Sequence, residues 1–204
     1  MARDTAVPAW IKRLRYSELA SHHPGRGLNA AFALINGFIS IALMAAAAVL
    51  ADAPMIFPSL GPTAFLFFYT PLAPAASPRN TLIGHAIGAL AGWGSVAAFG
   101  LTDAGPALQQ GVTWSYAMAA ASALGLTAGL MVLLSAPHPP AGATTLIVAL
   151  GLLTEIDELL VLMLAVVLLT VQAFLINRLA GVPYPLWRAG LQESGGQAGR
   201  ARRT

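Results

Sequence analysis

Four long apolar runs constrain this chain more than any other feature. They cover residues 28–50, 80–101, 112–134 and 158–178, and each is close to the roughly 20 residues that an α-helix needs to cross a bilayer. Charged residues make up 9% of the sequence and hydrophobic residues 57%, with a mean hydropathy of +0.70. These values exclude an ordinary soluble domain. The sequence therefore predicts an all-α polytopic membrane protein with four full transmembrane helices.

Two shorter apolar segments, 54–72 and 138–153, carry a proline motif near their starts. The pattern Pro-x-x-Gly-x-Thr occurs twice, as Pro58-Ser59-Leu60-Gly61-Pro62-Thr63 and as Pro139-Pro140-Ala141-Gly142-Ala143-Thr144. Proline removes a backbone donor and glycine frees the φ angle, so both motifs should interrupt a membrane helix. We expect each segment to be either an irregular complete span or a re-entrant half-helix.

The two motifs lie 81 residues apart, and the same offset maps the first two long runs onto the last two. We interpret the chain as two three-segment repeats, 28–101 and 109–180. An odd number of crossings in each repeat reverses the second, which gives an inverted-topology duplication of the kind found in many transporters. The alternative is a chance match of one short pattern.

Charge placement predicts the orientation in the membrane. With six crossings and the N-terminus inside, all eleven Lys and Arg fall on the cytoplasmic side, as the positive-inside rule requires. Four crossings would move Arg79 outside, so we prefer six. The net charge of +3 then reflects membrane orientation and not nucleic-acid binding. We expect a multi-pass protein of a bacterial inner membrane with both termini in the cytoplasm. The acidic residues that would face outward are Asp52, Asp103, Glu155, Asp157 and Glu158.

Three regions follow from this reading. Residues 1–27 form a basic leader, which we expect to be either a short helix on the membrane surface or a partly ordered polar segment. Residues 28–180 form the transmembrane domain. Residues 181–204 form a cytoplasmic C-terminal tail, whose arginines should have affinity for anionic lipid.

The starts of the two short segments are the expected binding site. A helix that begins inside the membrane presents unpaired N–H groups and the positive end of its dipole, which suits an anion. No Lys or Arg falls in the predicted core, so neutral donors would hold the anion weakly enough to release it. The alternative is that the prolines only kink packed helices. The predicted substrate-binding residues are Ser59, Gly61, Thr63, His138, Gly142, Thr144 and Thr145, beside the helix-breaking prolines Pro58, Pro62, Pro139 and Pro140.

Two histidines are further candidates. His138 adjoins the second motif and could couple to protons or contact substrate. His85, expected one turn inside its helix near the cytoplasmic interface, is the weaker candidate. Two histidines without a nearby intramembrane Asp or Glu make a poor metal site, and no Ser–His–acid arrangement is evident. We therefore predict no metal, no cofactor and no enzymatic activity.

Small residues recur at four-residue steps in two of the long runs, which puts them on one helix face. Such rows let helix backbones approach closely, so we expect a packing role, with a homo-oligomer contact as the alternative. The two rows are Gly84, Gly88 and Gly92, and Ala117, Ala121, Gly125 and Gly129.

The stretch from His138 to Thr144, together with Phe57 to Ala64, resembles the signature pair of the HPP family of integral membrane proteins. The resemblance runs from about Gly27 to Leu179. That family is usually described as four-spanning. Some members in plastids and cyanobacteria are associated with nitrite transport, and others carry cytosolic CBS domains, which we do not expect in this chain.

The resemblance implies a carrier or channel for a small monovalent anion, with nitrite as the leading candidate. The expected partners are thus the anion and the lipid bilayer. A non-transporting membrane scaffold or sensor subunit is the alternative function.

Overall fold

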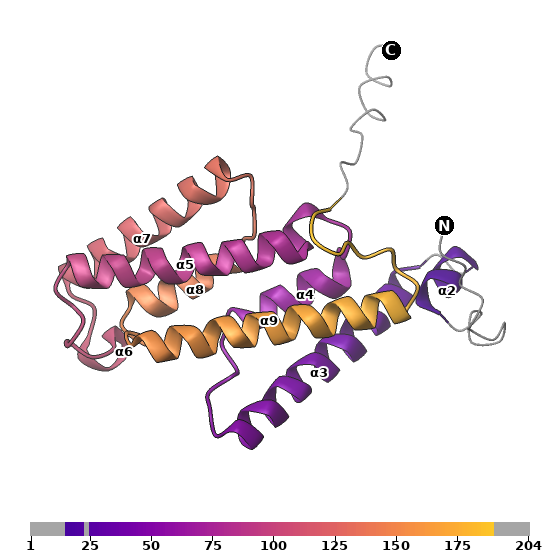
Figure 1. Cartoon of the computed structure of the whole chain (residues 1–204), viewed down its shortest axis with the longest axis horizontal. Coiled ribbons are helices and arrows are strands. Elements are labelled where there is room, and N and C mark those ends of the chain that lie inside the picture. Colours follow the sequence, from indigo (N-terminus) through magenta and orange to yellow (C-terminus); the bar gives the residue numbers. More distant parts are fainter. Residues whose placement is uncertain (1–14, 23–24, 190–204) are drawn as a thin grey trace, which may run out of the picture.

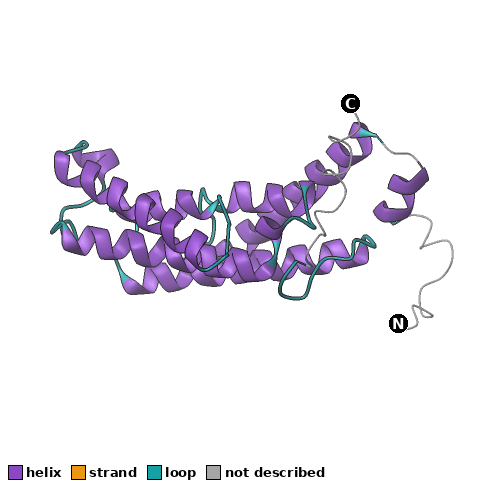
Figure 2. Cartoon of the chain, turned by 90° about the horizontal axis from the view of Figure 1, so that it is seen from above, coloured by secondary structure: helices purple, strands orange, loops and turns teal. Residues whose placement is uncertain are grey.

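The computed structural model describes residues 15–22 and 25–189, and within them the chain forms eight α-helices, one 3₁₀ turn and no strand (Figure 2). The predicted all-α fold is confirmed. Residues 1–14, 23–24 and 190–204, which include most of the predicted leader and tail, lie outside the described part. In chain order the elements are α2 (Tyr16–His22), α3 (Arg26–Ala51), α4 (Leu60–Tyr69), η1 (Pro74–Ala76), α5 (Pro78–Ala98), α6 (Ala107–Gln110), α7 (Trp114–Leu133), α8 (Ala141–Ala149) and α9 (Ile156–Leu179).

Four of these helices, α3, α5, α7 and α9, are long and apolar enough to cross a membrane, which confirms the four predicted spans. Their starts follow helix-capping chemistry. At α5 the Ser77 hydroxyl accepts from the backbone N–H of Asn80, and Pro78 occupies the first helical position. At α7 the Thr113 hydroxyl accepts in the same way from the N–H of Tyr116.

The acidic residues at the start of α9 cap that helix. Glu155 is its N-cap, and Asp157 and Glu158 lie in its first turn. One carboxylate oxygen of Glu158 accepts from the N–H of Thr154 at 2.9 Å and from that of Glu155 at 3.1 Å. This capping box satisfies amides that the first helical turn leaves unpaired, and it places negative charge at the positive end of the helix dipole.

The two short helices start near the middle of the long ones and run toward opposite ends (Figure 1). The end of α4 lies beside the last turns of α9, where the Asn177 amide donates to the Phe67 carbonyl at 3.0 Å. Just beyond α8, the Leu150 carbonyl accepts from the N–H of Ala107 in α6 at 2.9 Å. This arrangement is the one that an inverted duplication would require, although the duplication itself stays a prediction.

Helix α5 packs closely against α8 through its glycine row. A Cβ added at Gly84 would lie 2.7 Å from the Cβ of His138, and one added at Gly88 would lie 2.7 Å from the Ala141 carbonyl oxygen. Gly92 likewise approaches α8. The predicted packing role of this row is therefore confirmed, because any larger residue would push the two helices apart.

The second row of small residues, on α7, has a different environment. Ala121, Gly125 and Gly129 are exposed, and a Cβ added at either glycine would meet nothing within 4 Å. Since the row faces away from the helices of this chain, it does not serve packing within the chain.

Basic and acidic side chains gather at opposite ends of the helix bundle, except for Glu18 of α2, which lies at the basic end. Arg79 lies at the end shared with α2 and the end of α9, where its guanidinium donates to the carbonyls of Leu134 at 3.0 Å and Ser135 at 2.9 Å. It thus satisfies carbonyls that the end of α7 leaves unpaired. Which end faces the cytoplasm stays a prediction. Arg15, Arg26, Arg178 and Arg188 share the end of Arg79, whereas Asp103, Glu155, Asp157 and Glu158 lie at the end with α6.

Candidate functional site

A buried polar cluster lies where the first turns of α4 and α8 approach α5. Each member is at most 2% exposed, and the contacts between them are hydrogen bonds of side-chain hydroxyl and imidazole groups. Four of the members were predicted from the sequence. The cluster consists of Thr63, Thr81, His85, Thr127, His138, Thr144 and Thr145.

Two histidines form its centre. The Nε2 atoms of His85 and His138 lie 3.2 Å apart, and the ring centroids are 4.9 Å apart. The Thr63 hydroxyl oxygen lies 3.0 Å from Nε2 of His85 and 3.3 Å from Nε2 of His138. Three polar atoms from three parts of the chain therefore converge on one point.

The hydrogen-bond pattern assigns the tautomer of His138. Its Nδ1 lies 2.7 Å from the carbonyl oxygen of Ala75. A carbonyl can only accept, so Nδ1 carries the hydrogen. In the neutral ring Nε2 is then the acceptor, and it faces His85. The Thr81 hydroxyl, 3.4 Å from the same Nδ1, is a more distant neighbour.

The carbonyl that fixes His138 is held in place by residues around η1. The amide of Asn80 donates to the Pro74 carbonyl at 2.9 Å, and the Ser77 hydroxyl donates to the same oxygen at 2.8 Å. The Tyr184 hydroxyl donates to the next carbonyl along, that of Ala76. Burial raises the pKa of the Tyr184 phenol, which therefore stays a donor. These bonds orient the Ala75 carbonyl toward the imidazole.

A comparison of three threonines assigns the tautomer of His85. The hydroxyls of Thr63 and Thr145 donate to the carbonyl four residues earlier, at 2.8 Å and 3.0 Å. Thr144 differs, since among the described residues its hydroxyl bonds only Nδ1 of His85, at 2.7 Å. Thr144 is fully buried, so its hydrogen needs this acceptor. Nδ1 of His85 is therefore the acceptor, and Nε2 carries the hydrogen.

These assignments give one directional chain of hydrogen bonds. The Thr144 hydroxyl donates to Nδ1 of His85, the Nε2–H of His85 points at Nε2 of His138 and at Thr63, and the Nδ1–H of His138 donates to the Ala75 carbonyl. A single hydrogen thus lies between the two Nε2 atoms. Both rings are neutral in this arrangement.

The motif residues outside the cluster depart from expectation. Ser59 precedes α4, but its hydroxyl makes no capping bond and has no partner among the described residues, although its carbonyl accepts from Thr63. Gly61 is exposed and Gly142 is half-buried. Neither glycine has a positive φ, so neither uses the freedom of the φ angle that we expected glycine to supply in the motif.

The amides that follow the prolines of the second motif also differ from the prediction. At the start of α8 the N–H groups of Ala141, Gly142 and Ala143 bond the carbonyls three residues earlier at 3.0–3.1 Å, which include those of Pro139 and Pro140. The amides expected to be free are therefore paired in this conformation. Pro62 lies in the first turn of α4 as expected, and Pro58 precedes that helix. An anion here would depend on hydroxyl and imidazole donors.

Three members of the cluster were not in the predicted site. His85 lies two helical turns inside α5 and is fully buried, because the helix begins at Pro78. A signal existed: His85 and Thr81 are one turn apart on α5, and His85 neighbours the first glycine of the row that packs on α8. Thr127 of α7, which bonds the Thr145 hydroxyl at 2.9 Å, carried no comparable signal.

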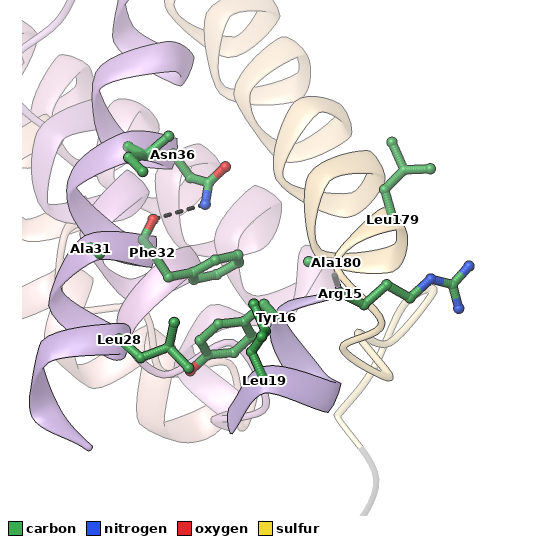
Figure 3. A pocket seen from close by; sticks show the side chains of 10 residues that line it. Arg15, Tyr16, Leu19, Leu28, Ala31, Phe32, Asn36, Leu179 and Ala180 are labelled. Carbon is green, nitrogen blue, oxygen red and sulfur yellow. Dashed lines mark hydrogen bonds between the residues drawn. The ribbon is translucent and has the colours of Figure 1, made fainter. Parts of the chain in front are cut away.

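A separate cavity of about 420 Å³ lies between α2, α3 and α9 (Figure 3). The Tyr16 ring stacks on Phe32 with centroids 4.0 Å apart, and the Asn36 amide donates to the Phe32 carbonyl at 2.8 Å. Arg15 points away from these two rings. None of the predicted site residues lines this cavity, so it is distinct from the histidine cluster. Within the described residues, no group of three or more His, Cys, Asp or Glu is placed to hold a metal.

Comparisons with known proteins agree with the fold. The family model described as the transmembrane region of HPP proteins matches residues 22–185. A transmembrane protein of Dictyostelium discoideum is 33% identical over 93 residues, which are 46% of this chain and 29% of that protein. The chain thus spans less than a third of the length of that relative. No solved structure matches this chain.

Proposed function

Because this chain belongs to the HPP family of transmembrane proteins, we propose that it carries a small monovalent anion across the membrane, with nitrite as the leading candidate. The observation that supports this most is the placement of Thr63 and Thr144, the threonines of the two motifs, on opposite nitrogens of His85. Polar groups are costly inside a membrane domain, and they mark substrate pathways by default.

The chemistry of the cluster suits a small anion. Its side chains offer hydroxyl and N–H donors, and among the described residues no charged side chain hydrogen-bonds either histidine of the pair. Donors of this kind bind an anion without the strong charge pairing that would slow its release. Nitrite, formate and nitrate are small enough to accept from two or three such donors at once.

Transport requires the cluster to open. In the described conformation the donors satisfy one another, and every member is buried. An anion therefore enters only when the start of α4 or α8 moves away from α5, so that Thr63 or Thr144 can turn its hydroxyl toward the substrate. Opening on alternate sides by two oppositely directed half-helices gives a carrier mechanism.

Flux into proteoliposomes tests the proposal. The purified protein should give saturable nitrite uptake above that of protein-free vesicles, with formate, nitrate and chloride added as competitors. Thr144→Val removes a donor, and we expect it to weaken apparent affinity by roughly tenfold, the effect of losing about 1.4 kcal/mol. Thr102→Val, at an exposed position outside the cluster, is the matched control and should match the wild type.

Absence of flux for all four anions, or unchanged transport in both Thr144→Val and Thr63→Val, would contradict the assignment.

The second candidate, a membrane scaffold, is favoured by the outward-facing row Ala121, Gly125 and Gly129 on α7. Small residues on an open helix face suit close contact with another transmembrane helix. A scaffold predicts a stable homo-oligomer or complex in mild detergent and no anion flux.

A further inference from the structure

We propose that His85 and His138 together bind one extra proton, and that this proton is the coupling ion of transport. The place for the proton follows from the geometry of the pair, whereas its role as a coupling ion rests on the proposed function. The two histidines come from α5 and from the segment before α8, so any opening between these elements alters the site.

The neutral pair has one open place for a proton. Nδ1 of His138 carries a hydrogen for Ala75, and one hydrogen lies between the two Nε2 atoms. Only Nδ1 of His85 has a lone pair that another ring does not use, and it accepts from Thr144 at 2.7 Å.

An added proton therefore goes to Nδ1 of His85. The Thr144 hydroxyl then turns and accepts from it, which frees the hydroxyl hydrogen for another acceptor, and no other bond of the chain needs to reverse. The His85 imidazolium donates from Nδ1 to Thr144 and from Nε2 to His138, so every nitrogen of the pair stays paired.

A second proton has no place. It would have to bind Nε2 of His138, which would set two N–H groups against each other across 3.2 Å and place two positive rings 4.9 Å apart. Like charges at this separation oppose each other strongly in a buried site. The pair thus holds one positive charge and no more, unless its two halves separate.

The surroundings of the pair leave that charge unbalanced. The groups that face it from each neighbouring element are uncharged hydroxyls and a carbonyl. Along α5, the charged Arg79 is already bonded to the carbonyls of Leu134 and Ser135, and the titratable Tyr184 bonds the Ala76 carbonyl beyond η1. The facing groups are those of Thr63 from α4, Thr81 from α5, Ala75 from η1 and Thr144 from α8.

A monovalent anion supplies the missing balance. Together the proton and the anion are neutral, and a neutral pair crosses a low-dielectric core at far lower cost than either ion alone. Protonation also turns the Thr144 hydroxyl into an acceptor and gives His85 two N–H donors. Proton binding and anion binding should therefore each strengthen the other, as linkage requires.

Nitrogen-15 NMR of histidine-labelled protein in nanodiscs tests the proton site directly. During acidification we expect the resonances of His85 and His138 to shift together with uptake of one proton. His22 is exposed on α2 and lies outside the pair. His85→Gln and His138→Gln assign the signals, and His22→Gln is the matched control. Two independent protonations, or none while the protein stays folded, would overturn the proposal.

A flux assay tests the coupling separately. Vesicles with an internal pH-sensitive dye report proton entry while nitrite uptake is measured, and protein-free vesicles correct for leakage of the undissociated acid. The wild type and His22→Gln should move about one proton per anion. In His85→Gln and His138→Gln the rate of proton entry should fall roughly tenfold. If these variants do not fold, Thr144→Val against Thr144→Ser tests the same site, because serine keeps the hydroxyl.

The possible results are distinct. Anion flux without proton movement would overturn the coupling and leave the proposed carrier intact. Single-proton titration without flux of any anion would overturn the carrier and leave the proton site intact.

Discussion

The two proline motifs share one pattern, yet their threonines have opposite hydrogen-bonding roles toward the His85 imidazole. Thr63 donates its hydrogen to the Ser59 carbonyl at 2.8 Å, so toward His85 it can only accept. Thr144 directs its hydrogen to His85 at 2.7 Å. Motif positions that look equivalent in sequence therefore supply an acceptor on one side of the ring and a donor on the other, which gives the hydrogen-bond chain its direction.

The same contrast extends to the flanking residues. At the offset of 81 residues, His138 of the second half corresponds to Phe57 of the first, and His85 corresponds to Val166 of α9. All four side chains are buried. At this offset each half contributes one histidine where the other has an apolar residue, so the predicted duplication would leave the site asymmetric.

The largest expected effect is a loss of stability when the close packing of α5 on α8 is disturbed. Gly88→Val would drive side-chain carbons into the Ala141 carbonyl, which lies 2.7 Å from a Cβ at that position. We expect a loss toward the upper end of about 1–3 kcal/mol, seen as a lower unfolding temperature in detergent. Gly129→Val, on the open face of α7, is the control and should unfold close to the wild type. Equal effects at both positions would show that α5 and α8 are not in close contact.

The next effect probes the donor side of His85. Thr144→Val leaves Nδ1 of a fully buried imidazole without its donor, which should cost about 1–3 kcal/mol. Thr144→Ser keeps the hydroxyl and should retain most of the stability. Thermal unfolding of the three proteins in the same detergent measures the difference. A serine variant as unstable as the valine variant would mean that the methyl group matters and the hydrogen bond does not.

A smaller effect is expected on the acceptor side. Thr63→Val removes a bond to a helix carbonyl and one acceptor for the Nε2–H of His85, which keeps Nε2 of His138 as a partner. We expect a cost of about 0.5–1.5 kcal/mol. The ratio of this loss to that of Thr144→Val, measured under identical conditions, compares the acceptor side of His85 with its donor side. A loss at Thr63 that equals or exceeds the loss at Thr144 would reverse our assignment of donor and acceptor.

The smallest effects should come from the glycines of the motifs. A Cβ at Gly61 would meet nothing within 4 Å, and one at Gly142 would meet only the Leu124 side chain at 3.5 Å. Alanine at either position should be tolerated or should stabilise by up to about 1 kcal/mol through helix propensity. Unfolding temperatures of both variants check this, and a marked destabilisation would reveal a conformation in which these glycines are closely approached.

Most of the fold could be predicted from the sequence, because apolar length and charge placement determine where helices can cross a membrane. The four spans and the proline-broken segments followed from that physics alone. Four of the seven members of the polar cluster also followed, namely Thr63, His138, Thr144 and Thr145. His85 was underrated because its depth in the membrane domain depends on where α5 begins. Ser77 caps α5 and Pro78 begins it, and hydropathy averaged along the chain does not detect these local features.

The pairing of the amides at α8 could not be predicted either. A turn closed by carbonyls three residues earlier depends on backbone angles that the proline pattern leaves open. The tautomers of the two histidines likewise depend on contacts between residues far apart in the sequence.

The hydrogen bonds through the histidine pair run in one direction, from Thr144 to the Ala75 carbonyl. Nitrogen-15 spectra of the neutral wild-type protein, assigned with His85→Gln and His138→Gln, measure it most directly. We predict opposite tautomers, with the hydrogen on Nε2 of His85 and on Nδ1 of His138, and a scalar coupling across the N–H···N bond between them. The same tautomer in both rings, or no coupling between them, would contradict this prediction.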